Sequence, residues 1–407
     1  MPTEIRPAKP EELDDVHFVV SYSFSGDRTD AGRQAMSHVE RMANPLVLLE
    51  DGEIVAALRV YDLVERINGG HVRMGGVSSV TCLPEHRRKG HVGKLLRHAL
   101  SDMRDAKQPL SALYTPHPML YRRFGWMVAA SSIKHTWHPK EVTTRDDRPA
   151  NGHAVRLTPE DWTRLEPVYS AYADGRTGFL VRDDIWWREA IFHRFYDPER
   201  KPNDVAVWVD DTGRDGGYVV YRSEKERRVA GFHETLLIQE FIALTRDAYN
   251  GLIRYINAHD LLDEIMWYGP LDDPLALALD DSERVKRSYQ DEFMLRVVDV
   301  PQAIAGRPPA LGSPEGAFTV HITDASAPWN QGMWRIESAG GVLHALKGKG
   351  TAQIQTDAPT FAAIYDGYIR TTDAVRTGLA ECTDPEAATL ADRILASDHP
   401  PYGSDFF

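Results

Sequence analysis

The order of predicted secondary-structure elements occurs twice along the chain, and this internal repeat restricts the possible folds more than any other feature. In the first copy, a short strand at Ile5 leads through a proline-containing turn into a helix with acidic residues in its first turn. In the second copy, a strand at Val155 leads to Thr158, a good N-cap, and Pro159, a good first helical residue. The pattern predicts two tandem α/β domains of the same fold.

The later elements of the two copies also correspond. In each copy, a strand, a turn and a strand precede a further strand, a helix and a closing strand. In the first copy the strand pair spans 45–60 with an Asp51-Gly52 turn, the next strand 77–83, the helix extends to about 103, and the closing strand spans 110–115. In the second copy the strand pair spans 205–221, the next strand 235–244, the helix 248–259 and the closing strand 264–268.

The last part of the chain follows a different pattern. Phe293 to Pro301 reads as an apolar strand that a proline stops. Further strands are expected at 318–323, 333–337 and 352–356, and helices at 358–364 and 386–395. Polar residues near 140 and the change of pattern near 290 predict domains at 1–140, 141–290 and 291–407.

Length and composition exclude several classes of protein. A chain of 407 residues is expected to form two or three domains. Without a long apolar run or a secretory signal, and with only Cys82 and Cys382, we expect a cytoplasmic protein that does not associate with membranes. The formal net charge of −13 argues against nucleic-acid binding and is compatible with a cationic substrate.

The stretch from Val77 to Leu96 carries the chemistry. A β-branched strand ends at Pro84, a basic turn with Gly90 follows, and an amphipathic helix begins. The first amides of a helix and the positive end of its dipole suit a diphosphate, and glycine allows close approach of the backbone. The alternative is a solvated basic helix start, since Arg-Arg-x-Gly alone is a weak signal.

This stretch resembles the acetyl-CoA motif of the GNAT superfamily, [RQ]-x-x-G-x-[GA]. Arg87 and Gly90 match the motif, whereas Val92 stands where Gly or Ala is usual. The strand is expected to offer backbone groups to the pantetheine arm, and the turn to hold the diphosphate. Cofactor contacts are therefore expected from Val80, Thr81, Cys82, Arg87, Arg88, Lys89, Gly90, Val92 and Gly93.

The whole chain resembles the enhanced intracellular survival (Eis) acetyltransferases. The features that carry the resemblance are the Arg87 motif, Leu120–Gly125, Leu295–Pro301 and the terminal Asp405-Phe406-Phe407. The resemblance implies two fused GNAT folds followed by an α+β domain like sterol carrier proteins, with acetyl-CoA as donor. It also implies aminoglycosides, other polyamines or lysine side chains as acceptors, in a cleft between the GNAT domains, and a homo-oligomer, specifically a hexamer.

The second copy is expected to bind no cofactor. Its matching turn, Ala243 to Gly251, has one arginine, no glycine at the turn, and Asp247 where a phosphate would lie. We therefore expect one acetyl-CoA per chain.

Two residues are candidates for proton transfer. Tyr121 follows the closing strand of the first copy, and its phenol is close enough in pKa to a thiol to act as general acid, although a packed aromatic is the alternative. The resemblance assigns the acid role to this tyrosine and the base role to the terminal carboxylate, here on Phe407. That carboxylate has a low reference pKa, which burial beside the two phenylalanine rings would raise.

Other residues have two interpretations each. Cys82 is a nucleophile or, more simply, a small buried side chain. His86, His91 and His98 lack metal-ligand spacing, so we expect surface positions and no metal site. Asp27 and Trp187 are candidate substrate contacts, against a solvated loop and core packing.

Together these features predict an acetyl-CoA-dependent N-acetyltransferase that acts by direct attack of a primary amine on the thioester. A protein-lysine acetyltransferase using the same site is one alternative. The other is a lipid-binding or scaffold protein that retains a vestigial GNAT motif, because a sterol-carrier-like domain is implied at 291–407.

Overall fold

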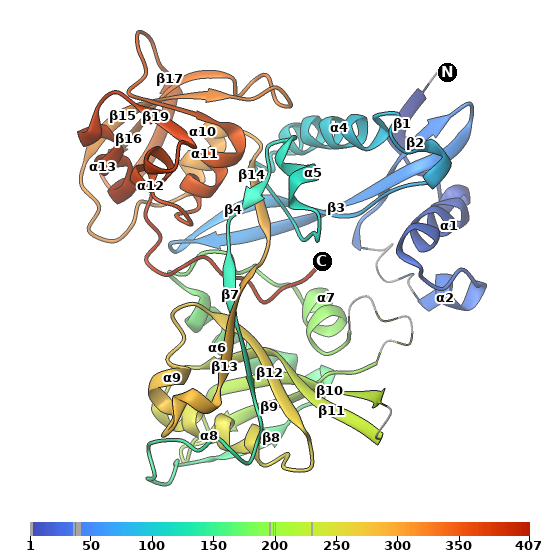
Figure 1. Cartoon of the computed structure of the whole chain (residues 1–407), viewed down its shortest axis with the longest axis vertical. Helices are drawn as coiled ribbons and strands as arrows, with labels where there is room; N and C mark the ends of the chain where they lie inside the picture. The colour runs from blue at the N-terminus through green and yellow to red at the C-terminus, as the bar shows by residue number, and fades with distance from the viewer. Residues whose placement is uncertain are drawn as a thin grey trace.

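The computed structural model describes residues 3–35, 37, 42–194, 197, 199, 201–228 and 231–407. Strands of the described residues form two seven-stranded sheets and one five-stranded sheet. Figure 1 shows them as three lobes, with the first sheet at the upper right, the second below it and the third at the upper left. The C-terminus lies between the lobes, near the middle of the molecule.

The first sheet has the order β1-β2-β3-β4-β5-β14-β6. Most of its strands are antiparallel, but β4 and β5 run parallel because helix α4 connects them. Helix α4 packs its apolar stripe, which includes Leu95, Leu96 and Leu100, against the sheet. The elements are β1 (Thr3–Pro7), η1 (Pro10–Glu12), α1 (Leu13–Phe24), α2 (Asp30–Ala35), β2 (Pro45–Glu50), β3 (Glu53–Ile67), β4 (Gly70–Cys82), η2 (Pro84–His86), α4 (His91–Asp105), β5 (Leu110–Leu113), α5 (Pro118–Arg122), β6 (Met127–Val128) and β14 (Met294–Val297).

The second sheet repeats this plan, as the sequence predicts. Its order is β13-β7-β12-β11-β10-β9-β8, and β11 and β12 are parallel around helix α8. The elements are β7 (Ser131–Trp137), β8 (His153–Arg156), η3 (Pro159–Arg164), α6 (Leu165–Ala173), α7 (Asp184–Trp186), the π-helical turn η4 (Trp187–Ile191), β9 (Asp204–Val209), β10 (Asp215–Arg228), β11 (Gly231–Ala243), α8 (Arg246–Asn257), β12 (Glu264–Pro270), α9 (Leu275–Ala278), η5 (Ser282–Arg284) and β13 (Lys286–Asp291).

The third sheet has the order β17-β16-β15-β18-β19. Helix α11, all of whose residues are buried, lies between this sheet and the β14 end of the first sheet. The elements are α10 (Val300–Gly306), β15 (Gly316–Thr323), β16 (Gly332–Ala339), β17 (Val342–Lys347), β18 (Ile354–Asp357), α11 (Ala358–Tyr365), α12 (Thr371–Arg376), β19 (Ala380–Cys382) and α13 (Pro385–Ile394).

Strand exchange joins the two large sheets at both ends of the second repeat. Strand β7 lies in the second sheet although it precedes residue 140, and β14 lies between β5 and β6 of the first sheet although it follows residue 290. The sheets therefore do not divide at these two positions. One buried apolar cluster runs through all three lobes and includes Phe407. None of the described helices has the length and apolar composition that a membrane span requires.

Candidate active site between the two GNAT-like sheets

The turn between β4 and α4 presents unused backbone donors. The amides from Arg88 to Gly93 have no acceptor among the described residues. Gly90 is the N-cap, with a φ of 83°, and no side chain caps the helix. A Cβ on Gly90 would meet nothing within 4 Å, so the space before these amides is open. The turn thus has the free donors and the access that a diphosphate requires.

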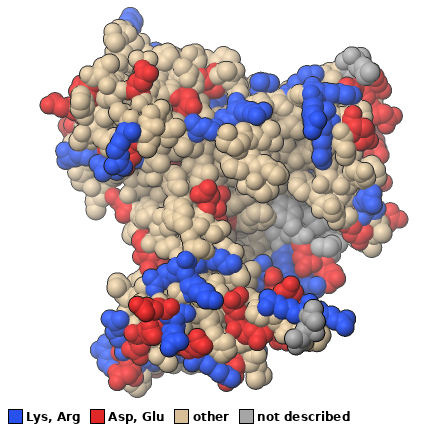
Figure 2. All heavy atoms as spheres, viewed as in Figure 1, with Lys and Arg blue, Asp and Glu red and all other residues tan. Residues whose placement is uncertain are grey.

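The three basic residues of this turn have different surroundings. Arg87 donates through Nε to the carbonyl of Cys82, 3.0 Å away, and the exposed Arg88 has a φ of 65°, in the left-handed region. Lys89 is paired with Glu50, with Nζ 2.8 Å from Oε2. Arg87 and Arg88 are therefore better candidates than Lys89 for binding a phosphate. Figure 2 shows Lys and Arg side chains gathered over the part of the surface formed by α4.

The other expected cofactor residues lie on both sides of this turn. Val80, Thr81 and Cys82 form the end of β4, with the side chains of Thr81 and Cys82 buried. Cys82 is therefore packed as a small apolar side chain. Val92 is half-buried in the first turn of α4, and Gly93 is buried where a Cβ would lie 2.9 Å from the Phe124 ring.

Strands β4 and β5 diverge beside these residues. Their parallel pairing covers only Met74 to Gly76 and Leu110 to Ala112. Beyond it, β4 pairs on its other edge with β3, with an irregularity next to Ser79, whose φ is 52°. The edge of β4 from Val77 to Cys82 is therefore open to an extended amide-containing ligand.

The C-terminal residue lies at this fork. A Cβ on Gly76 would come within 2.8 Å of the Phe407 ring, so the missing side chain provides the room for it. The ring centroids of Tyr61, Tyr114 and Trp186 lie 6.2, 5.4 and 6.5 Å from that of Phe407. The end of the chain is thus held among aromatic side chains of both repeats.

A buried charge cluster fixes the tail at Asp405, two residues before the C-terminal residue. Arg182 donates to the carboxylate of Asp405, with Nε 2.9 Å from Oδ1, and pairs through both terminal nitrogens with Glu240. Trp186 donates to Asp405 at 2.7 Å, and Tyr114 donates to the Asp405 backbone carbonyl. Sequence reasoning missed Arg182, Glu240 and Tyr114, because their relation to the tail depends on contacts across more than 160 residues.

Tyr121 lies in the short helix α5 with its ring buried. Burial raises the pKa of Tyr121 to about 12, so the phenol is protonated at neutral pH. Its hydroxyl donates to no group among the described residues, while its ring packs edge-on against Trp126 with centroids 6.4 Å apart. A protonated hydroxyl without a protein acceptor is available to a bound molecule.

One cavity is lined in part by the tail, and a second is lined by residues that contact it. The larger, of about 660 Å³, is lined by Tyr268, Glu292, Asp405 and Phe406 among others. The smaller, of about 360 Å³, has Tyr61 and Trp186 in its wall, both in ring contact with Phe407. Its described lining contains Asp62, Asp183 and Glu189 and no basic side chain.

The two expected substrate contacts are not in these walls. Trp187 is fully buried and stacks on Trp162, so its expected position in the wall of a substrate pocket is wrong, whereas its neighbour Trp186 lines the smaller cavity. Asp27 is exposed in the loop before α2, where its carboxylate accepts from the Thr29 amide at 2.9 Å. That hydrogen bond is the main reason why the pKa of Asp27 is lowered. Asp27 lines neither cavity.

The matching turn of the second repeat is closed by protein groups. Thr245 caps α8 by accepting from the Ala248 amide, and Arg246 pairs with Asp146 and Asp247. Asp247 accepts in turn from the Asn151 amide. The cap thus occupies the Ala248 amide, and two carboxylates lie at this turn where the first repeat has Arg88 and Lys89.

Two of the sequence features that carried the family resemblance meet at one junction. The guanidinium of Arg296 passes over Gly125, where a Cβ would lie 1.8 Å from Nη1. Arg296 is fully buried and donates from Nη2 to both carboxylate oxygens of Asp324. These residues therefore join α5 and β14 to the third lobe.

The surface position expected for the three histidines is wrong for His91. His91 is 3% exposed at the start of α4, whereas the side chains of His86 and His98 are 26% and 41% exposed. His86 and His91 approach Glu50, which lies at the end of β2 and has no motif that would have identified it.

Comparison with protein families agrees with this architecture. Residues 4–129 and 178–297 each match an acetyltransferase (GNAT) domain, and residues 300–404 match a sterol carrier protein domain. The fold and the site thus define a GNAT acyltransferase with two tandem GNAT domains and a sterol-carrier-like third domain.

Within that class the chain is similar to the Eis N-acetyltransferases. It is 26% identical to an uncharacterized N-acetyltransferase of Streptomyces coelicolor, over 100% of this chain and 98% of that protein. It is 24% identical to the N-acetyltransferase Eis of Mycobacterium tuberculosis, over 87% of each. Among solved structures, a probable N-acyltransferase of Enterococcus faecalis and Eis1 of Mycobacterium abscessus share the fold over 100% of each chain, at TM-scores of 0.88 and 0.81 and identities of 20% and 23%.

Proposed function

We propose that this protein transfers the acetyl group of acetyl-CoA to a primary amine of a polyamine or aminoglycoside-type acceptor. The observation that carries the proposal is the β4–α4 turn, where the amides from Arg88 to Gly93 lack acceptors beside the open edge of β4. These groups fit a diphosphate followed by an extended amide arm, with Arg87 and Arg88 supplying positive charge. At the matching turn of the second repeat Thr245 caps the helix and Asp146 and Asp247 lie close by, so one donor molecule per chain is proposed.

Phe407 at the fork and Tyr121 in α5 supply the proton transfers of the proposed direct attack. The amine nitrogen forms a bond with the thioester carbon while the carbon–sulfur bond breaks. The Phe407 carboxylate accepts the proton that the attacking ammonium loses, and the Tyr121 hydroxyl protonates the leaving thiolate. Burial raises the pKa of Tyr121 to about 12, which keeps the phenol protonated at neutral pH but widens the difference between its pKa and that of a thiol.

The smaller cavity suits a cationic acceptor. Its carboxylates attract ammonium groups, and its Tyr61 and Trp186 walls lead to the Phe407 ring. Within this wall Asp62 pairs with Arg73, with Oδ2 3.0 Å from Nη2, and Asp183 accepts from the Trp186 amide at 2.7 Å.

Release of free thiol from acetyl-CoA tests the proposal. The purified protein is mixed with acetyl-CoA and kanamycin, spermidine, a lysine peptide or buffer alone. Thiol release with the two small amines, above the buffer rate, is the expected result. Release with the peptide alone would favour the protein-modifying alternative. No release with any amine, and no rise in melting temperature with CoA, would favour a vestigial motif.

A further inference from the structure

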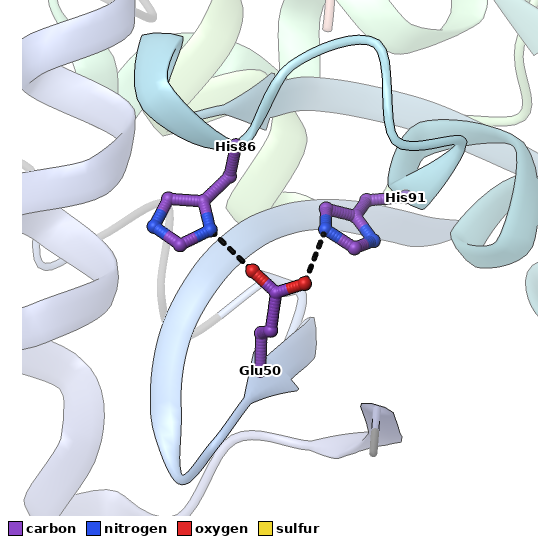
Figure 3. Close-up of side chains that lie close together, drawn as sticks. All are labelled: Glu50, His86 and His91. Carbon is purple, nitrogen blue, oxygen red and sulfur yellow. Dashed lines mark hydrogen bonds and ion pairs between the residues drawn. The ribbon is translucent and has the colours of Figure 1, made fainter. Parts of the chain in front are cut away.

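Three potential metal ligands converge beside the β4–α4 turn. Figure 3 shows Glu50 between His86 and His91, which come from η2 and from the first residue of α4. The Nδ1 of His86 lies 2.6 Å from Oε2 of Glu50, and the Nε2 of His91 lies 3.5 Å from Oε1. One ligand atom from each of the three residues lies within 4.8 Å of the others.

His91 is the unusual member of this cluster. Its side chain is 2% exposed, its Nε2 has only the 3.5 Å ion-pair contact with Glu50, and its Nδ1 has no hydrogen-bond partner among the described residues. Burial of an unpartnered polar group is costly, so such a ring calls for a ligand. A neutral imidazole nitrogen is a common ligand for metal ions.

We propose that Glu50, His86 and His91 bind a divalent transition-metal ion, with Zn²⁺ the best match to two imidazoles and one carboxylate. Ligand atoms around a tetrahedral zinc lie about 3.4 Å apart. The 2.6 Å contact between His86 and Glu50 must therefore lengthen when a metal ion binds. The half-exposed ring of His86 is free to make this adjustment.

Lys89 occupies the cation position at present. Its Nζ is 2.8 Å from Oε2 of Glu50 and 3.4 Å from Nδ1 of His86. Its ammonium and a metal ion would compete for the same carboxylate. A bound metal would release Lys89 into the turn that holds the diphosphate, and this consequence alone depends on the proposed function.

Zinc titration of the chelator-treated, full-length protein tests the site. Isothermal calorimetry should show one Zn²⁺ per chain with micromolar or tighter affinity. Glu50→Gln and His91→Gln should each weaken binding by at least about tenfold. Lys89→Met should tighten it, because the competing ammonium is removed. Thermal melts of the metal-free variants establish that each is folded.

Two nearby variants serve as matched controls. His98→Gln removes an exposed histidine of the same helix, and Cys82→Ser removes the nearby soft thiol. Both should bind zinc like the unmodified protein. The proposal is overturned if zinc does not bind at about 100 μM, if both cluster variants bind it undiminished, or if only Cys82→Ser loses it. None of these outcomes depends on acetyl transfer.

Discussion

Gly76 is the residue at which the end of the chain meets the first sheet. It stands in the last pair that joins β4 to β5, and an alanine there would place a methyl group within 2.8 Å of the Phe407 ring. Glycine in the interior of a strand weakens the strand, so its presence here reflects close approach of another group. The neighbouring Gly75 likewise leaves room for the side chain of Met103 in α4, because a Cβ on Gly75 would lie 2.2 Å from the Met103 sulfur.

Tyr121→Phe should reduce turnover and leave acetyl-CoA binding almost unchanged. The substitution removes only the hydroxyl, which has no protein partner, so the packing against Trp126 is retained. Loss of a general acid typically costs about 100-fold or more in kcat. Steady-state kinetics and calorimetric titration with CoA measure the two quantities. Equal turnover would remove Tyr121 from the proposed role.

A buried carboxyl pair predicts how stability changes with pH. Glu65 and Asp366 are both fully buried, and their carboxylate oxygens have no hydrogen-bond partners. Burial raises the pKa of Asp366 to about 7, with Arg307 opposing, and burial followed by the charge of Asp366 raises the pKa of Glu65. Since an unfolded aspartate ionises near pH 4, the unfolded state binds fewer protons between about pH 4 and 7, and stability falls as pH rises through this window.

Asp366→Asn should therefore stabilise the protein at pH 8 and change it little at pH 4.5. Asparagine does not titrate, so the advantage should grow across the window and be complete above pH 7. A rise in melting temperature of at least about 2 °C at pH 8 is expected. Asp105→Asn, at an exposed position of α4, is the control and should show no such trend. An advantage equal at both pH values would contradict the assignment.

At the scale of elements, the two strand–turn–helix units differ in what their turns offer. Arg88→Ala should weaken acetyl-CoA binding by about 1–3 kcal/mol, or roughly five- to 150-fold, through loss of a charged hydrogen bond. Arg88→Lys should recover part of this loss. Calorimetry should also give one acetyl-CoA per chain.

The matched variant lies at the second turn. Arg246 is engaged by Asp146 and Asp247, and Thr245 caps the helix, so Arg246→Ala should leave affinity and stoichiometry unchanged. Undiminished binding by Arg88→Ala would exclude Arg88 from the site. Two molecules per chain would disprove the proposal that the second repeat binds none.

The regular elements of both repeats follow from local patterns. The Asp51-Gly52 turn joins β2 to β3. The apolar residues that recur at helical spacing in α4 and α8 form the buried faces of these helices. In the third domain, the predicted strand after Phe293 ends earlier, because Asp299 caps a helix that includes Pro301. Short elements such as β17, α12 and β19 were missed, since few residues carry their pattern.

The sequence indicates the part of the candidate site that one segment supplies, and does not indicate the parts in which distant segments combine. The motif from Val77 to Gly93 could be identified because its donors are consecutive in sequence. Glu50, Trp186 and Arg182 could not, because each acts through contacts with distant segments that no local period encodes. Trp187 shows the same limit, since two adjacent tryptophans cannot be assigned to core or cavity without the fold.

At the scale of the whole molecule, the third domain carries the chain end back to the two GNAT domains. Residues 395–407 contain no helix or strand and run between the lobes (Figure 1). The Tyr402 amide donates to Thr177, and Asp405 is held by Arg182 and Trp186. The tail therefore joins all three domains at the candidate active site, which makes the chemical state of the terminus a property of the whole assembly.

Changing that terminus separates packing from chemistry. Three residues added after Phe407 should abolish acetyl transfer, because the buried end has no room for them and the carboxylate is displaced.

Conversion of the Phe407 carboxylate to a carboxamide by peptide ligation keeps the ring among Tyr61, Tyr114 and Trp186 but removes the charge. If the carboxylate is the base, this protein should retain its melting temperature and CoA affinity and lose about 100-fold in kcat. The same three residues at the N-terminus should have no effect. A carboxamide protein with full turnover would leave Phe407 a packing role only, and an extended protein with full turnover would show that the tail need not end at the fork.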